Sequence, residues 1–177
     1  MFHKEENKTY QHLTESRVII RFQDCDPLQH LNNAKYLDYF FNAREDQISK
    51  LYDFKFSEVF FNYKTSWVVF QSRLAYVRPA LVSEWVRIYS RLIYVADDTI
   101  VTEYFMTNDE KTQLKTIFWV TSKYVDVQTG KKVPHQTDVQ YYLETIKAPN
   151  LDFPTMDFDR RVKEIKLELA NENSSLA

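Results

Sequence analysis

The sequence predicts an α+β domain in which one long helix covers one face of an antiparallel sheet. Three patterns lead to this prediction: a short β-branched segment, then a segment with helical period, then four segments in which apolar and polar residues alternate. A long helix that stands between one strand and a run of further strands can bury its apolar side against the sheet that those strands form. We therefore expect a helix layer packed on a five-stranded sheet.

The first strand is expected at residues 17–23, RVIIRFQ, because this segment is apolar and β-branched between charged flanks. The helix is expected at residues 34–51, where apolar side chains recur every three or four positions, namely Leu37, Phe40, Phe41, Ile48 and Leu51. This length corresponds to about five helical turns. Either Asn32 or Asn33 is suited to cap the helix, because an Asn side chain accepts hydrogen bonds from the free amides of the first turn.

The four alternating segments are expected to form consecutive antiparallel strands at residues 67–78, 85–96, 99–107 and 113–126. In the second of these, the alternation places on one face Val86, Ile88, Ser90, Leu92 and Tyr94. The polar connections between the strands are short, as in hairpins.

The remaining segments carry weaker signals. Residues 53–65 are expected to form a loop and residues 136–146 a short helix, whereas VKEIKLELA near the C-terminus fits either a strand or a helix. The sequence shows no internal repeat and no second domain. The expected organisation is an N-terminal extension, one domain and a C-terminal tail, at residues 1–16, 17–147 and 148–177.

The composition fits one globular domain and gives no sign of a nucleic-acid partner. With 177 residues, 44% hydrophobic content and 16% aromatic residues, the chain is large enough to bury a core. A formal charge of −2 provides no general attraction to a polyanion. The single cysteine, Cys25, excludes a disulfide within the chain and is typical of a reducing compartment.

The sequence does not predict export or membrane insertion. Residues 1–17 are too charged for the apolar region of a signal peptide. No segment approaches the roughly 18 consecutive apolar residues that span a bilayer. We therefore expect the protein in the cytosol.

Residues 24–33, DCDPLQHLNN, place carboxylates, an imidazole and amides between the first strand and the helix. One interpretation is a metal site made by Asp24, Asp26 and His30. The loop does not fit a calcium EF-hand, because Gln29 stands at the sixth position and Lys35 at the twelfth. A second interpretation is structural, since Asp, Pro and Asn are expected where a strand turns into a helix.

A third interpretation is the transfer of an acyl group to water. A carboxylate beside a helix N-terminus stays ionised near neutral pH, and it can activate a water molecule or attack a carbonyl. Backbone amides at the start of the helix, or of a nearby strand, can stabilise the resulting oxyanion. Cys25 is a poor candidate nucleophile, because the two flanking acids would raise its pKa. The residues alone leave all three interpretations open.

The segment RFQDCDPLQHLNNAKYLDYFFNARED resembles the signature of acyl-CoA thioesterases of the 4-hydroxybenzoyl-CoA thioesterase type. The family pattern is approximately Asp-x-Asp-x-x-x-His-x-Asn-Asn followed by a helix with an early Tyr, and it falls on Asp24, Asp26, His30, Asn32, Asn33 and Tyr36. Residues 74–80 (LAYVRPA) and 115–134 resemble two later strands of the family. The likeness spans residues 17–146 and implies the hot-dog fold, in which an antiparallel sheet wraps around one long helix.

The resemblance also implies the roles of individual residues. Asp26 would be the catalytic carboxylate, acting as general base or nucleophile on an acyl-CoA thioester. A backbone amide near Ser66 or Trp67 would polarise the thioester carbonyl. The side chains that would line or order the site are His30, Asn32, Asn33 and Tyr36. No metal and no cofactor would be needed.

The resemblance further implies how the substrate is held and how the chain assembles. The phosphates of CoA need cations, for which Arg73 and Arg78 are available. Family members pair two sheets edge to edge and build the site from both chains, so we expect a homodimer or a dimer of dimers.

The sequence departs from the family pattern at two positions, and two other functions stay open. Many relatives have Gly where Gln29 and Ser83 stand here. Within the same fold, (R)-specific enoyl-CoA hydratases use the motif Asp-x-Asn-Pro-x-His, but here Asp26 holds the Asn position and His30 follows Asp24 by six residues instead of five. A protein that binds acyl-CoA or another ligand without turnover would share every feature of the fold.

Overall fold

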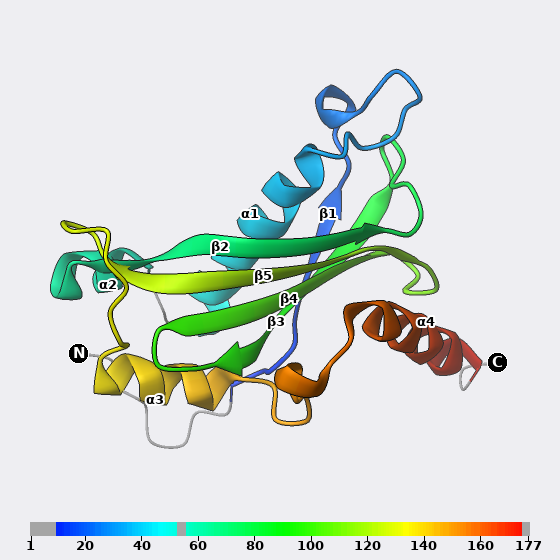
Figure 1. Cartoon of the computed structure of the whole chain (residues 1–177). Coiled ribbons are helices and arrows are strands. Elements are labelled where there is room, and N and C mark those ends of the chain that lie inside the picture. Colours follow the sequence, from blue (N-terminus) through cyan, green and yellow to red (C-terminus); the bar gives the residue numbers. More distant parts are fainter. Residues whose placement is uncertain (1–9, 53–55, 175–177) are drawn as a thin grey trace.

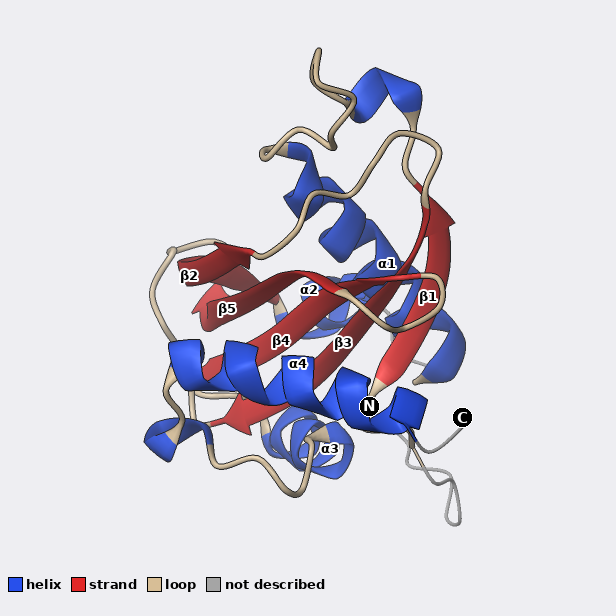
Figure 2. Cartoon of the chain, turned by 90° about the vertical axis from the view of Figure 1, so that its right-hand side faces the viewer, coloured by secondary structure: helices blue, strands red, loops and turns tan. Residues whose placement is uncertain are grey.

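The computed structural model describes residues 10–52 and 56–174. Within these residues five strands form one antiparallel sheet in the spatial order β1-β3-β4-β5-β2, with the bounds β1 Thr14–Ile19, β2 Thr65–Tyr76, β3 Trp85–Val95, β4 Thr99–Asn108 and β5 Leu114–Asp126. The helices of the described residues are α1 Lys35–Leu51, α2 Phe56–Tyr63, α3 Thr137–Ile146 and α4 Phe158–Ser174, with short 3-10 turns at Phe22–Asp24 and Phe153–Thr155. Helices α1 and α4 lie on opposite faces of the sheet (Figures 1 and 2).

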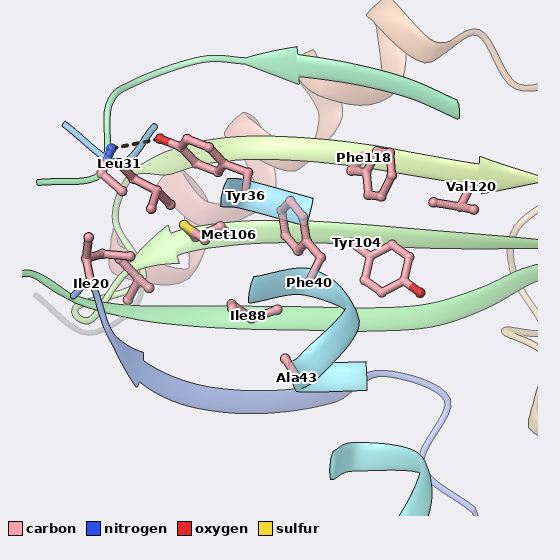
Figure 3. Close-up of a cluster of buried hydrophobic side chains, with 12 residues drawn as sticks. Ile20, Leu31, Tyr36, Phe40, Ala43, Ile88, Tyr104, Met106, Phe118 and Val120 are labelled. Atoms are coloured by element: carbon pink, nitrogen blue, oxygen red, sulfur yellow. Dashed lines mark hydrogen bonds between the residues drawn. The ribbon is translucent and has the colours of Figure 1, made fainter. Parts of the chain in front are cut away.

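Helix α1 packs along one face of the sheet, which confirms the predicted helix and the hot-dog arrangement. Phe40 is fully buried, and its ring centroid lies 5.7 Å from that of Phe118 and 5.6 Å from that of Tyr104. Figure 3 shows Phe40 between α1 and the strands, with Tyr36 and Ala43 on the same side of the helix. Burial of such side chains supplies the main favourable free energy of the fold.

The buried stripe of α1 differs from the predicted one. Phe41 and Leu51 are exposed, whereas Arg44 and Gln47 are buried. Gln47 is satisfied in the core, because it donates to the carbonyl of Ile88 at 3.1 Å and accepts from Thr14 Oγ1 at 2.7 Å. Polar residues can occupy this stripe because the sheet offers them hydrogen-bond partners.

The second face of the sheet is covered by α4. Phe158, Ile165 and Leu169 are buried against a cluster that includes Phe105 and Trp119. The segment VKEIKLELA is therefore a helix, and the expected C-terminal tail folds back onto the sheet (Figure 2). A helix on an otherwise bare apolar face keeps that face out of water.

A buried cluster of charges joins α4 to the sheet. Glu103 of β4 is fully buried, and its carboxylate accepts from Arg91 Nε at 2.8 Å, Trp119 Nε1 at 2.8 Å and Arg161 Nε at 3.2 Å. Arg161 also donates to Glu168 at 2.9 Å. Each charge in the cluster is thus paired and hydrogen-bonded, as buried charges require.

Three details of the predicted elements are wrong. The expected loop at 53–65 contains α2, although residues 53–55 lie outside the described part. The first strand begins at Thr14 and ends at Ile19, because Ile19 pairs with Trp85, the first residue of β3, and Phe22–Asp24 form a 3-10 turn where the strand was expected to continue. Tyr94 lies on the α4 face, since the β3–β4 register shifts between Leu92 and Tyr94.

Strand β2 forms an apolar edge of the sheet. Val69 is 58% exposed and Phe70 is 68% exposed, and Val68 is exposed as well. Edge strand β1 instead carries charges, with Arg17 paired to Asp109 at 2.7 Å. A long apolar edge with unpaired backbone groups is a template for pairing with another strand.

None of the described helices is long and apolar enough to cross a membrane.

Candidate active site

The loop between β1 and α1 is built around Asp26. Its Oδ1 accepts hydrogen bonds from the amides of Leu28 at 2.9 Å and His30 at 3.0 Å, and its own amide donates to the carbonyl of His30 at 2.8 Å. The other carboxylate oxygen, Oδ2, accepts no hydrogen bond from the described residues. Two charge-assisted bonds therefore fix the carboxylate and leave one oxygen open for chemistry.

The two positions where many relatives have Gly adopt left-handed backbone conformations. Gln29 has φ 63° and Ser83 has φ 62°. The amide of Val82 donates to the carbonyl of Gln29 at 2.9 Å, so these two turns lie against each other. Glycine favours this conformation and other residues adopt it at a cost of roughly 1–2 kcal/mol, so this chain keeps the loop shape at some expense of stability.

Asp24 anchors the loop to α1. Its Oδ2 accepts from the Tyr39 hydroxyl at 2.9 Å, and that hydroxyl accepts from the amide of Arg21 at 2.9 Å. Burial, together with the Asp24 carboxylate, raises the pKa of Tyr39 to about 12, so the phenol stays protonated and continues to donate. The Asp24 side chain is thus held by α1, while the Asp26 side chain is held by the amides of its own turn. In the described part of the chain no three His, Cys, Asp or Glu side chains gather as metal ligands would.

Cys25 stays a thiol in this loop. Burial, followed by the charges of Asp24 and Asp26, raises its pKa. Its Sγ donates to the carbonyl of Arg21 at 3.4 Å. A thiol with a raised pKa is a weak nucleophile, which agrees with the sequence prediction.

The start of α1 differs from the predicted cap. The N-cap residue is Ala34 and no side chain caps it. Asn32 Oδ1 accepts from the amide of Ala34 at 3.0 Å, so Asn32 orders the turn before the helix, and Asn33 accepts from the Tyr76 hydroxyl through its carbonyl at 2.8 Å. The prediction that Asn32 or Asn33 caps the helix is wrong, because the chain forms an extra turn between Asn32 and Lys35.

Tyr36 and His30 connect the loop to residues 77–84. The Tyr36 hydroxyl accepts from the amide of Ala80 at 3.0 Å, and burial raises the pKa of Tyr36. His30 forms an isolated β-bridge with Leu81. The segment 77–84 is thereby held beside Asp26, and the exposed Arg78 belongs to that segment. Arg73, in contrast, pairs with Asp159 of α4 at 3.1 Å on the opposite side of the sheet.

Ser66 and Trp67 lie at the far end of β2 from Asp26. Tyr76 ends β2 next to the start of α1, because its hydroxyl reaches Asn33. From Ser66 to Tyr76 the strand advances roughly 30 Å at about 3.3 Å per residue. Within one chain the structure therefore brings together Asp26, His30, Asn32, Asn33 and Tyr36, and not the amides of Ser66 and Trp67.

The Trp67 side chain is positioned by a histidine that the sequence prediction left out. Trp67 Nε1 donates to His135 Nε2 at 3.0 Å, and His135 Nδ1 lies 3.0 Å from the carbonyl of Ala96. Burial lowers the pKa of His135, so the ring is neutral and Nε2 can accept. Sequence spacing gives no signal for this pair, because 68 positions separate the two residues.

A cavity of about 350 Å³ lies between the C-terminal half of α1, α3 and the sheet. Trp67 and Val69 of β2 line it on the exposed edge, and Leu92 of β3 lines its inner end. Most of its walls are apolar, although Arg44 and Tyr104 also line it. Its size and lining are those of a small-molecule site.

These features agree with the comparison to known families. A family model described as the thioesterase-like superfamily matches residues 20–143, which is more than half of the chain. The chain belongs to the thioesterase-like superfamily. Among its relatives, the long-chain acyl-CoA thioesterase FadM of Escherichia coli (strain K12) is 24% identical over 130 residues, which cover 73% of this chain and 96% of FadM.

Solved structures of other thioesterases share the fold of this superfamily member. A probable thioesterase from Escherichia coli, YbaW, superposes with a TM-score of 0.66 at 22% identity, covering 76% of this chain and 98% of YbaW. Slr0204, a 1,4-dihydroxy-2-naphthoyl-CoA thioesterase from Synechocystis, superposes with a TM-score of 0.66 at 12% identity, covering 74% of this chain and 95% of Slr0204. A thioesterase from Thermus thermophilus, solved with coenzyme A and Zn, superposes with a TM-score of 0.63 at 21% identity, covering 77% of this chain and 96% of the Thermus chain. At these identities the likeness establishes the hot-dog fold.

Proposed function

We propose that this protein hydrolyses an acyl-CoA thioester to the free acid and CoA, with Asp26 as the catalytic carboxylate. The observation that carries the proposal is the Asp26 side chain, whose Oδ1 is fixed by two amides while Oδ2 is left without a described partner. As general base, Asp26 takes a proton from water while the water oxygen attacks the carbonyl carbon. The tetrahedral intermediate then expels the CoA thiolate, which leaves as the thiol once it takes up that proton.

The choice of CoA as leaving group is supported by the relatives and by one cation. FadM is a long-chain acyl-CoA thioesterase, and the Thermus thermophilus thioesterase was solved with coenzyme A. Arg78 is exposed in the segment that lies against the Asp26 loop. Of the two arginines considered for the CoA phosphates, Arg78 is therefore the stronger candidate, because Arg73 is already paired with Asp159. The cytosolic location expected from the sequence belongs to the same proposal.

The test is a panel of acyl-CoA and aryl-CoA thioesters, with release of free thiol as the readout. We expect turnover of at least one class of acyl chain. Hydration of crotonyl-CoA without thiol release would favour the enoyl-CoA hydratase, and CoA binding without any turnover would favour a binding protein. Either result would contradict the proposal.

The proposed assembly is a homodimer joined along β2. If two β2 strands pair antiparallel about their middle, the Thr65 end of one strand lies beside the Tyr76 end of the other. The Tyr76 end adjoins the Asp26 loop through Asn33. A dimer would therefore bring the amides of Ser66 and Trp67 from one chain to Asp26 of the other, and this supports their role in polarising the thioester carbonyl.

In such a dimer one chain would supply both the carbonyl-binding amide and the acyl pocket. Trp67 lines the cavity at the β2 edge, so a thioester carbonyl bound at the Trp67 amide would place its acyl chain at the entrance of that cavity. The partner would supply the carboxylate. A dimer of dimers would need a surface other than the sheet face opposite α1, because α4 covers that face.

Charges placed on the β2 edge should separate the two chains. By light scattering, the native protein is expected to have twice the mass of one chain, which is 21.3 kDa. A variant with both Val68→Lys and Phe70→Lys should be a monomer and should lose roughly tenfold or more in kcat/KM, because the site would lose half of its groups. Leu167→Lys, which changes an exposed apolar residue of α4, is the matched control and should remain a dimer. A fully active native monomer would contradict this assembly.

A further inference from the structure

Arg44 is an unusual buried cation. The buried lysines and arginines of the described residues are Arg44, Lys115 and Arg161. Lys115 pairs with Glu84 at 2.7 Å, and Arg161 pairs with Glu103 at 3.2 Å. Arg44, only 7% exposed, forms no ion pair with any described carboxylate. Buried charges are normally paired, so the charge of Arg44 needs another explanation.

The contacts of Arg44 leave part of its guanidinium without a protein partner. Its Nη1 donates to Ser90 Oγ at 3.1 Å, and its guanidinium also interacts with the Tyr52 side chain, whose ring centroid lies 5.4 Å from the guanidinium carbon. Among the described residues, Thr116 Oγ1 is the buried side-chain nitrogen or oxygen that has no hydrogen-bond partner. Arg44 lines the cavity, so donors of its guanidinium that these contacts leave unused are within reach of a ligand bound there.

The cavity runs across the sheet towards Arg44. It begins at Trp67 and Val69 of edge strand β2 and reaches Leu92 of β3, three strand spacings away, or roughly 14 Å at about 4.8 Å per spacing. Its apolar walls between these points include Ile100 and Val120. This shape fits an extended acyl chain of medium length that enters at the β2 edge.

The inner end of the cavity leaves one tyrosine hydroxyl for such a chain. The hydroxyls of Tyr52 and Tyr142 are not available as donors, because each already donates to a backbone carbonyl. Tyr104 also lines the cavity, and burial raises its pKa to about 12, so its hydroxyl stays protonated. Figure 3 shows this hydroxyl pointing along the sheet, away from Met106. Glu45, which also lines the cavity, is exposed and thus solvated.

We infer that the cavity binds an acyl chain whose far end carries a carboxylate, and that Arg44 pairs with this carboxylate. This inference rests on the proposed function for the thioester end of the substrate. The substrate class is then the CoA monothioester of a medium-length dicarboxylic acid. An unsubstituted fatty acyl chain would place its terminal methyl group against the guanidinium and strip water from it, which is unfavourable. Arg44 would thereby determine specificity without taking part in bond breaking.

The kinetic test compares dodecanedioyl-CoA with dodecanoyl-CoA, which differ at the far end of the chain. The native protein should show a kcat/KM at least tenfold higher for dodecanedioyl-CoA. Arg44→Met should reduce this preference by roughly 10- to 100-fold, as expected for losing a hydrogen bond to a charged group. Arg44→Lys should retain most of the preference, and Arg160→Met, a change at an exposed arginine of α4, should leave it unaltered.

Calorimetric binding of two methyl esters, whose ester end stands in for the thioester, tests the inference without turnover. Monomethyl dodecanedioate, which keeps a carboxylate only at its far end, should bind the native protein more tightly than methyl dodecanoate, and Arg44→Met should remove the difference. If no thioester is hydrolysed, the proposed function fails while this measurement still decides the inference. Equal binding of the two esters, tighter binding of methyl 12-hydroxydodecanoate than of monomethyl dodecanedioate, or a preference that survives Arg44→Met would each overturn it. The comparison within the native protein remains decisive even if the variant does not fold.

Discussion

Asp26→Asn is expected to lower kcat for thioester hydrolysis by roughly 10²- to 10⁴-fold, the range typical of losing a general base. The fold should survive the change. Asn keeps an Oδ1 that can accept from the amides of Leu28 and His30, so the turn loses its charge and not its acceptor. Steady-state kinetics and thermal unfolding of the same preparation separate the two effects.

Two further variants make the result specific to the Asp26 carboxylate. Asp26→Ala should lose activity and also stability, since two amides lose their acceptor at about 0.5–1.5 kcal/mol each. Asp24→Asn removes the neighbouring carboxylate, which binds Tyr39 and not the reacting atoms, and should stay within a few-fold of native kcat. The mechanism is wrong if Asp26→Asn turns over like the native protein, or if Asp24→Asn proves equally inactive.

Glu103→Ala is expected to lower the free energy of unfolding by about 3–5 kcal/mol, because it leaves the largely buried Arg91 without its ion-pair partner and removes the buried partner of Arg161. Glu103 is fully buried and accepts from Arg91, Trp119 and Arg161, which come from β3, β5 and α4. Its loss should therefore loosen α4 from the sheet. Urea unfolding monitored by far-ultraviolet circular dichroism measures the change.

The matched control is the exposed ion pair between the same two layers. Asp159→Ala removes the partner of Arg73, whose pair is 3.1 Å long with both side chains more than half exposed. Such a pair contributes under about 1 kcal/mol. If Glu103→Ala cost no more than Asp159→Ala, the buried cluster would not hold α4 in place. At temperatures where Glu103→Ala is folded, its kcat should match the native value, since Glu103 and Asp26 lie in different parts of the fold.

The loop between β1 and α1 and the neighbouring segment 77–84 keep left-handed turns at the two positions where this chain lacks the Gly of many relatives. Gln29 and Ser83 replace residues that are often Gly, yet both hold the left-handed conformation that Gly would favour. The loop is held by backbone bonds such as those from Val82 to Gln29 and from Leu31 to Ala80. Enough such bonds fix the backbone that non-glycine residues accept its strain at these positions.

The helix stripe shows where periodicity was insufficient. Spacing placed Phe41 and Leu51 in the core, but they are exposed, and Arg44 and Gln47 are buried in their place. Arg44 falls four positions from both Phe40 and Ile48, and Gln47 falls seven positions, about two turns, after Phe40, so the spacing did contain the signal. Their polar character hid it, because the hydrogen-bond partners in β1 and β3 cannot be identified from α1 alone.

The order of the elements, the long helix and the carboxylate loop at its start could all be predicted from the amino-acid sequence. These depend on residues a few positions apart, as Asp26 depends on the amides of Leu28 and His30. Three features became visible only in the folded chain: Arg44 lines a cavity, His135 positions Trp67, and α4 pairs with Glu103 across 58 residues. The reason is physical: local periodicity and turn chemistry are written in neighbouring residues, whereas the partner of a buried polar group is set by packing between segments far apart in the chain.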